Sequence, residues 1–166
     1  MHSTLYWIDA PGPLRLAIMA RPRAGDWLED EIAHWRDSGV GIVMSLLERH
    51  EVEDLELQRE ATLCAENGIE FRSFPIPDRG LPADTGEALR FIASVAATGK
   101  PVAIHCRAGI GRSSLMAAAM LVGGGMEPAA ALAAIGAARG VPIPDTDAQR
   151  DWVLALASDA TRGPHG

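Results

Sequence analysis

Lysine is nearly absent from this sequence: Lys100 is the single lysine among fifteen basic residues, and all the others are arginine. Acidic residues are more numerous, at 22, and the formal net charge is −7. A negative field of this kind repels polyanions, so we expect no nucleic-acid partner. Arginine offers forked contacts with oxyanions that lysine cannot make, although a compositional bias toward arginine would give the same count.

Cysteine and long hydrophobic runs are also scarce. The two cysteines, Cys64 and Cys106, could form one bridge at most, which excludes a disulfide framework of the secreted kind and favours a reducing compartment. Near the start of the chain Asp9, Pro11 and Pro13 interrupt the apolar patches, so neither a signal-peptide core nor a membrane span can be drawn there. We therefore expect a cytoplasmic protein.

Helical and strand patterns alternate from residue 26 onward. Near-continuous apolar segments such as 41–47 (GIVMSLL) are typical of parallel strands covered on both faces. Capping boxes are expected at Asp26 with Glu29 and at Thr146 with Gln149. The patterns predict strands over 41–47, 69–76 and 101–105, a helix over about 54–67, and helices that begin near residues 26, 84, 114, 128 and 146.

This alternation predicts an α/β fold, with three layers (α/β/α) around a central, mostly parallel sheet. No repeat, low-complexity tract or linker interrupts the chain, and 166 residues suffice for one substantial core but not for two ordinary domains. We expect a single domain over residues 1–166, with its core at about 27–122.

Cys64 lies on the helix predicted over 54–67, where it shares one face with Leu57 and Ala61. It is either a small residue packed on that face or a redox partner that could protect a reactive thiolate by forming a disulfide with it.

The segment from Cys106 to Arg112 joins a buried strand to the first turn of a helix. Backbone N–H groups at such a junction have no intrahelical partner, and the helix dipole adds positive potential, so the junction is suited to an anion. Gly109 and Gly111 allow the backbone to curl until successive amides face a tetrahedral oxyanion. The predicted phosphate-binding residues are Arg107, Ala108, Gly109, Ile110, Gly111 and Arg112.

The side chains around this loop suggest nucleophilic chemistry. Helix-terminus amides and a nearby guanidinium favour the thiolate form of Cys106, which makes it a candidate nucleophile. Arg112 can hold two phosphoryl oxygens and follow the charge of the transition state. Ser113 can donate a hydrogen bond to the sulfur when Cys106 leaves, and His105 is expected to bond the loop backbone and fix its shape.

The string HCRAGIGRSS, residues 105–114, matches the HCxxGxxR[S/T] signature of the protein tyrosine phosphatase superfamily. The chain most resembles the small dual-specificity phosphatases, particularly the cyclin-dependent-kinase-associated type, over about residues 27–122. The resemblance implies the Cys-x5-Arg phosphatase fold. In those proteins a PI-x-D-x-x-x-P segment precedes the cysteine, and PIPDRGLP with Asp78 resembles it here.

Asp78 is also needed on chemical grounds, since attack by a thiolate leaves an alkoxide or phenoxide that requires a proton. A positioned carboxylic acid typically supplies about 10²–10⁴ in rate. The resulting carboxylate would then activate water to hydrolyse a phosphocysteine intermediate, and neither a metal nor a cofactor is required. Taken alone, Asp78 could instead be a turn residue before Gly80.

The expected activity is hydrolysis of phosphotyrosine and phosphoserine/threonine in a protein or peptide, with phosphate, sulfate or vanadate also able to occupy the loop. A short chain has little room for the segments that deepen tyrosine-specific clefts. Arg79 and residues 11–25 are candidates for the rim, and Gln149 could position water rather than cap a helix.

Three other functions remain open. A phosphoinositide or other non-protein phosphate ester could be the substrate, because Arg107 could contact a second phosphate, although Ile110 is apolar where some lipid-directed relatives carry a cation. A rhodanese-type sulfurtransferase also has a cysteine loop before a helix, but it does not need Asp78. A catalytically silent phosphopeptide-binding module would usually lack the cysteine, the arginine or the acid.

Overall fold

The central sheet has five strands. The computed structural model describes the backbone of residues 3–162 and the side chains of residues 3–156. Strand order is β1-β2-β5-β3-β4, and β1 alone runs antiparallel to its neighbour, which confirms the mostly parallel sheet. The strands are β1 (Tyr6–Trp7), β2 (Leu16–Met19), β3 (Ile42–Ser45), β4 (Glu70–Ser73) and β5 (Val102–His105).

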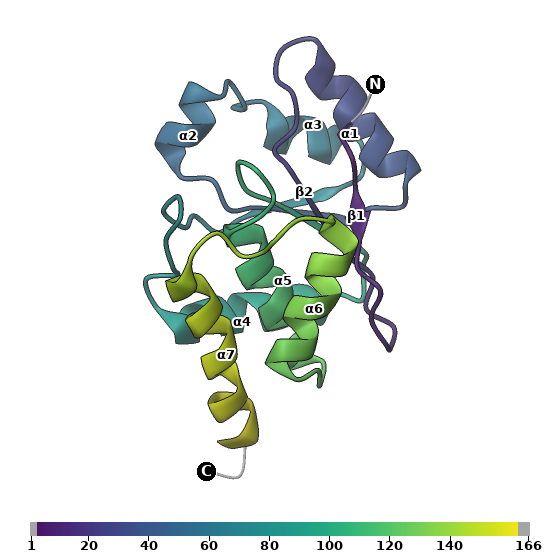
Figure 1. Cartoon of the computed structure of the whole chain (residues 1–166). Helices are drawn as coiled ribbons and strands as arrows, with labels where there is room; N and C mark the ends of the chain where they lie inside the picture. Colours follow the sequence, from purple (N-terminus) through teal and green to yellow (C-terminus); the bar gives the residue numbers. More distant parts are fainter. Residues whose placement is uncertain (1–2, 163–166) are drawn as a thin grey trace.

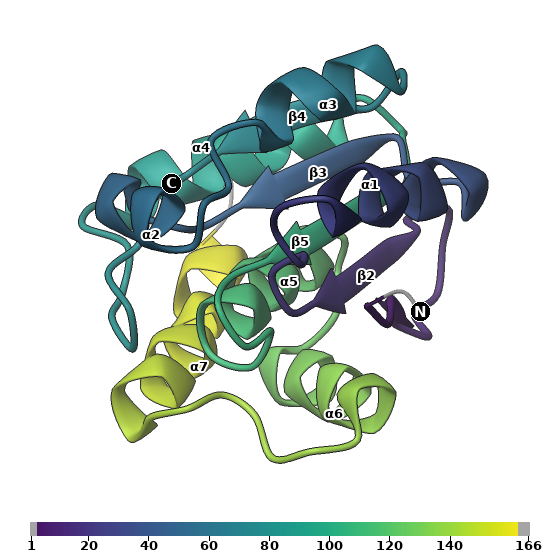
Figure 2. The same cartoon turned by 90° about the horizontal axis from the view of Figure 1, so that it is seen from above.

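Helices cover both faces of this sheet (Figures 1 and 2), as predicted for an α/β/α arrangement. The chain also forms a short helix, α2 (Arg49–Asp54), beyond the carboxyl end of β3. One face is covered by α1 (Trp27–Asp37) and α3 (Glu60–Glu66), and the other by α4 (Thr85–Ala96), α5 (Arg112–Gly123), α6 (Pro128–Arg139) and α7 (Asp147–Arg162). None of the helices, within the described residues, is long and apolar enough to cross a membrane.

The core is divided between the two faces because successive strand residues point in opposite directions. On β2, Ala17 and Met19 face Trp35 of α1, whereas Leu16 and Ile18 face α5. Helix α5 is enclosed by the sheet, α4, α6 and α7 and is buried from Arg112 to Val122. Its first turn is therefore held rigidly against the carboxyl ends of the strands.

The single helix expected over residues 54–67 is wrong. The chain forms α2 and α3 instead and turns between them, where Glu56 has a φ of +56°, outside the helical range. Leu57 is buried by this turn, and Ala61 is exposed. The predicted helical stripe rested on the spacing of Leu57, Ala61 and Cys64. Of these three residues, only Cys64 is both buried and part of a helix.

The N-terminal segment differs most from expectation. Residues 11–25 were candidates for the rim of the site. Leu16–Met19 instead form the buried strand β2, whereas the Arg21 N–H, after that strand, donates to the Arg107 carbonyl of the loop at 3.2 Å. Two smaller expectations are also corrected: Asp26 makes no side-chain cap to α1, and the strand expected over 69–76 ends at Ser73. Pro128, by contrast, occupies the first turn of α6 as predicted.

Candidate active site

The loop between β5 and α5 lies at the carboxyl edge of the sheet. His105, the last residue of β5, is paired in register with Met19 of β2 and Ser45 of β3. Gly109 has a φ of +72°, and a Cβ at this position would lie 2.5 Å from the Met19 carbonyl oxygen. Glycine is therefore required both by the backbone conformation and by the close approach of β2.

The loop that follows Cys106 carries backbone donors that are not used within the protein. Within the described part of the chain, the backbone N–H groups of residues 107–112 make no hydrogen bond to protein. Cys106 is only 2% exposed, and the Ser113 hydroxyl donates to its Sγ at 3.0 Å. These N–H groups are therefore available to an oxyanion, and their role as a phosphate-binding ring stays a prediction.

Arg112 is buried, with only 1% of its side chain exposed, and several hydrogen bonds hold its guanidinium. Its Nη1 donates to Glu51 Oε1 at 2.6 Å and its Nη2 donates to Glu51 Oε2 at 2.9 Å. Nη1 also donates to the carbonyl oxygens of Ile76 at 2.9 Å and Leu46 at 3.4 Å. Burial lowers the pKa of Arg112, but the Glu51 hydrogen bonds and the charges of Cys106, Glu51 and Asp78 raise it overall, so the guanidinium stays charged.

Glu51, the residue that holds Arg112, was not predicted. Burial raises its pKa, but hydrogen bonds from Arg112, from the Glu48 backbone N–H and from Arg107 together lower it to about 2. Arg107 Nε donates to Glu51 Oε2 at 3.2 Å. Glu51 is thus an anion shared by two arginines of the loop.

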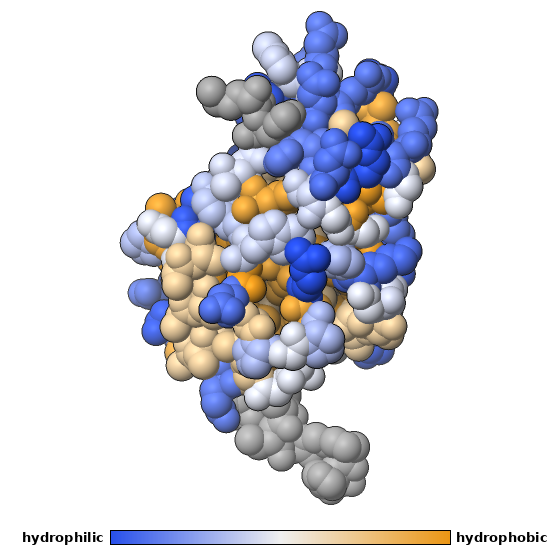
Figure 3. Space-filling view, turned by 90° about the vertical axis from the view of Figure 1, so that its right-hand side faces the viewer, coloured by the Kyte–Doolittle hydropathy of each residue, from blue (hydrophilic) through white to orange (hydrophobic). Residues whose placement is uncertain are grey.

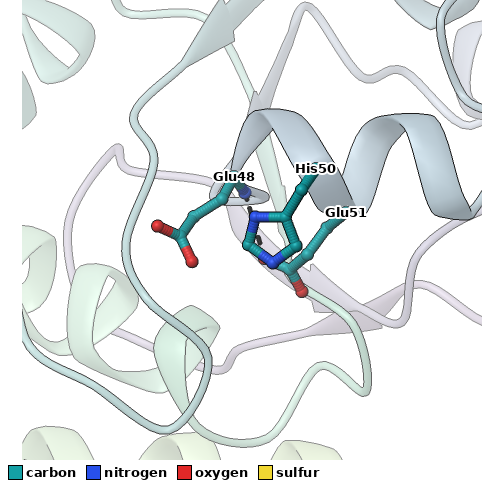
Figure 4. A group of neighbouring side chains, drawn as sticks. All are labelled: Glu48, His50 and Glu51. Atoms are coloured by element: carbon teal, nitrogen blue, oxygen red, sulfur yellow. Dashed lines mark hydrogen bonds between the residues drawn. The ribbon is translucent and has the colours of Figure 1, made fainter.

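Glu48, His50 and Glu51 also form a small cluster at the start of α2 (Figure 4), with one potential ligand atom each within 4.8 Å of one another. Both oxygens of Glu51 already accept hydrogen bonds from Arg112, and the Glu48 N–H donates to Oε1 at 3.0 Å. A metal ion there would also face the Arg112 charge. The contacts describe a helix cap better than a metal site.

His105 contacts the loop backbone as expected, with its Nδ1 3.3 Å from the Cys106 carbonyl oxygen. The other ring nitrogen, Nε2, lies 2.6 Å from Glu60 Oε2, and both side chains are buried. Since the carbonyl can only accept, Nδ1 must carry a proton to make the first bond. Glu60 was not identified from the sequence either.

Asp78 stands beside the loop and not within it. Its Oδ1 lies 3.2 Å from Arg112 Nη2, and 55% of its side chain is exposed. The next residue, Arg79, has a φ of +60° and is exposed. This turn places Asp78 at the mouth of the loop.

Gln149 joins the Asp78 turn to the start of α7. Its backbone N–H donates to Thr146 Oγ1 at 3.1 Å and its Oε1 accepts from the Thr146 N–H at 3.2 Å, which confirms the capping box. Its Nε2 also donates to the Gly80 carbonyl at 3.1 Å. The oxygen and the nitrogen of the Gln149 amide are therefore both hydrogen-bonded to backbone groups.

Cys64 lies on α3 in the core cluster on the α1 side of the sheet, whereas Cys106 belongs to the cluster on the α5 side. Both are free thiols. Burial and the charge of Glu60 raise the pKa of Cys64, which keeps the thiol protonated. These surroundings favour the packing role over the redox role.

An apolar cavity of about 710 Å³ lies at the other end of α5, between Leu89 of α4, Met120 of α5 and Leu156 of α7. None of residues 106–112 lines it, and Lys100 is the only charged residue among those described that do. Figure 3 shows hydrophobic surface gathered on the lower part of the molecule, below a hydrophilic upper part. The charged loop, and not this cavity, suits a phosphate ester.

The fold and the Cys106–Arg112 loop define a phosphatase of the protein tyrosine phosphatase superfamily, of the small dual-specificity kind. Residues 17–126 match the family described as "Tc-R-P: Polymorphic toxin system, DSP-PTPase phosphatase", and the chain belongs to that family. No curated protein matches the chain in sequence.

Solved structures of phosphatases share the fold. Kinase associated phosphatase (KAP), with its catalytic-site cysteine replaced by serine, gives a TM-score of 0.83 at 18% identity over 97% of both chains. Tk-PTP in its active form gives 0.71 at 26% identity, over 92% of this chain and 97% of Tk-PTP. PTPMT1 in complex with PI(5)P gives 0.69 at 22% identity, over 93% of this chain and 97% of PTPMT1.

Proposed function

We propose that residues 1–166 act as one phosphatase domain that hydrolyses phosphotyrosine and phosphoserine/threonine through a phosphocysteine intermediate. The observation that supports this most is the loop that joins Cys106 to the buried Arg112 guanidinium: its backbone N–H groups, from residues 107–112, make no hydrogen bond within the described part of the chain, and the charges of Cys106 and Arg112 interact. Because the chemistry needs Cys106 as a free thiol, we propose a reducing, cytoplasmic setting.

In the first step the Cys106 thiolate attacks phosphorus and the bond from phosphorus to the ester oxygen breaks. Asp78 donates its proton to that oxygen, so the alcohol or phenol leaves neutral. The N–H ring and Arg112 stabilise the charge on the three remaining oxygens. The product of this step is phosphocysteine.

In the second step the Asp78 carboxylate takes a proton from water as its oxygen attacks the phosphocysteine. The bond from sulfur to phosphorus breaks, and the Ser113 hydroxyl, 3.0 Å from the sulfur, stabilises the thiolate that leaves. Inorganic phosphate is released and Asp78 is again protonated. Both half-reactions are written with side chains and backbone N–H groups of this chain and with water.

Access to the loop supports dual specificity. Arg107 and Ala108 are exposed, and Asp78 reaches the loop from an exposed turn. A loop that is open at this edge admits the short phosphoserine and phosphothreonine side chains as well as phosphotyrosine. A phosphorylated protein or peptide is therefore the proposed substrate.

A phosphoinositide is the second candidate, since PTPMT1, which shares the fold, is seen in complex with PI(5)P. Arg107 is 43% exposed and could meet a second phosphate, but its Nε is already bonded to Glu51. A second phosphate would have to compete with that carboxylate, which favours the protein substrate.

Turnover of a phosphotyrosine peptide, a phosphothreonine peptide and a phosphoinositide tests the proposal, with Cys106→Ser as the inactive control. We expect hydrolysis of both peptides, weaker hydrolysis of the lipid and none by the variant. A preference for the lipid would reverse the choice of substrate. Binding of phosphopeptide without turnover would make the protein a silent binding module.

A further inference from the structure

Each carbonyl group of loop residues 106–111 is hydrogen-bonded to a partner that lies outside the row of unpaired N–H groups at 107–112 or is a side chain. Four of these partners lie within the loop, on its flanking elements or on the segment after β2: His105 Nδ1 for Cys106, the Arg21 N–H for Arg107, Ser114 Oγ for Ile110 and the Leu115 N–H for Gly111. The other two carbonyls, of Ala108 and Gly109, are held from a distant helix.

Arg139, the last residue of α6, makes both of these distant contacts. Its Nε donates to the Gly109 carbonyl at 3.2 Å and its Nη2 donates to the Ala108 carbonyl at 3.3 Å. The guanidinium therefore spans the tip of the loop, where the backbone has to pass through the left-handed conformation of Gly109.

Tyr6 of β1, the only tyrosine of the chain, supports Arg139 from the other side. The Arg139 Cζ lies 4.4 Å from the centre of the Tyr6 ring, within the range of a cation–π contact. Figure 1 shows α6 beside β1, so the first strand and the sixth helix meet at this contact.

The planarity of the peptide group links these outward contacts to the ring of donors. In a trans peptide the C=O and the following N–H point in opposite directions. Holding the Ala108 carbonyl outward therefore directs the Gly109 N–H inward, and holding the Gly109 carbonyl directs the Ile110 N–H inward. If either peptide turned over, it would present a carbonyl oxygen to the phosphate in place of a donor.

We propose that Arg139, supported by Tyr6, is a positioning residue that sets the direction of two of the phosphate-binding amides. The inference rests on the proposed function, which assigns the loop to phosphate. It gives α6 and the N-terminal strand a part in the reaction, although neither contributes a group that touches the substrate.

The test measures vanadate affinity, kcat, KM and thermal unfolding for Arg139→Ala, Arg139→Lys and Tyr6→Phe. Arg90→Ala, which removes an exposed arginine from α4, is the matched control. We expect Arg139→Ala to weaken vanadate binding and lower kcat/KM by about 10- to 100-fold, the range for hydrogen bonds to charged groups. Arg139→Lys should recover part of both, since one ammonium can bond one carbonyl, and Tyr6→Phe should resemble the wild type.

Two results would overturn the inference. One is an Arg139→Ala variant with the vanadate affinity and kcat/KM of Arg90→Ala. The other is a loss at Arg139→Ala fully explained by a smaller folded fraction at the assay temperature, without recovery in Arg139→Lys. Vanadate affinity is measured without turnover, so a wild type that binds vanadate but hydrolyses nothing would contradict the proposed function alone.

Discussion

Glu51 holds both terminal nitrogens of Arg112, with Nη1–Oε1 at 2.6 Å and Nη2–Oε2 at 2.9 Å, in an environment where each side chain is 1% exposed. A buried arginine with this geometry cannot turn away from the loop. The pair therefore keeps the guanidinium in place before any phosphate arrives, so the proposed phosphate-binding site is preorganised.

Glu51→Gln should destabilise the protein in a pH-dependent way. The fall of the Glu51 pKa from 4.5 to about 2 corresponds to roughly 3 kcal/mol of folding free energy. Because the folded pKa is the lower one, this stability is present above about pH 4.5 and is lost as the pH falls toward 2. Urea unfolding of both proteins between pH 7 and pH 3 measures the difference.

Glu53→Gln, on the same helix but exposed, is the control for that experiment. Surface ion pairs contribute little, about 0–1 kcal/mol, so it should unfold like the wild type at every pH. A Glu51→Gln variant that matched Glu53→Gln would contradict the role assigned to the Glu51–Arg112 pair.

Asp78→Asn should lower turnover by about 10²–10⁴-fold while vanadate still binds. The loss of turnover should be greater for phosphothreonine than for an aryl phosphate with a weakly basic leaving group. The threonine alkoxide must be protonated as it leaves, whereas a weakly basic phenoxide can leave without a proton. Asp145→Asn is the comparison, because Asp145 is a second carboxylate close to the loop. Its Oδ2 would lie 2.6 Å from a Cβ added to Gly111. A greater loss at Asp145 than at Asp78 would move the acid to the segment before α7.

Arg112→Lys should cost about 10²–10³-fold in turnover, the usual effect of removing one transition-state donor, and should also weaken vanadate binding. Lysine cannot make the two-pronged contact with Glu51 and reach the phosphate as well. The same exchange at Arg107, which contacts Glu51 through Nε alone, should have a much smaller effect. Equal kinetic losses at the two positions would contradict the distinction.

Gly109→Ala should lower the free energy of unfolding by about 1–3 kcal/mol, because a side chain there is strained and would meet the β2 backbone. Vanadate affinity should fall with it. Gly123→Ala has open space around its Cβ and lies at the end of α5, so its stability should be unchanged or slightly raised. Chemical denaturation of the two variants separates these outcomes.

The loop itself could be predicted from the sequence because its parts are adjacent. Residues 105–114 contain the proposed nucleophile, the unpaired amides, the buried arginine and the serine, and a strand–loop–helix junction places them close together. Asp78 is 34 residues from Arg112 and was found because PIPDRGLP resembles the PI-x-D-x-x-x-P segment of the family and because the leaving group needs a proton.

The supporting residues could not be predicted in the same way. Glu51, Glu60 and Arg139 reach the loop from 61, 45 and 30 residues away. In the sequence each looks like an ordinary surface charge, and only tertiary packing shows which of them are buried against the loop. The pattern Glu48-x-x-Glu51 directly after an apolar strand was the one local indication of α2.

The strand β2 was missed for a related reason. It is only four residues long, and the proline-rich stretch before it resembles a loop. Its place in the sheet comes from pairing with β5, more than eighty residues later, and no periodicity within four residues could indicate that. The helix predicted over 54–67 failed because an apolar spacing that suits a helix also suits a turn that buries Leu57.

The most direct test of the mechanism is to trap the intermediate. Asp78→Asn, which should form phosphocysteine from an aryl phosphate faster than it hydrolyses it, would be mixed with that substrate, quenched in acid and digested for mass spectrometry. We predict one phosphoryl group on the peptide that carries Cys106, and none when Cys106→Ser is added to the variant. A phosphoryl group found elsewhere on the chain, or turnover that survives Cys106→Ser, would contradict the mechanism.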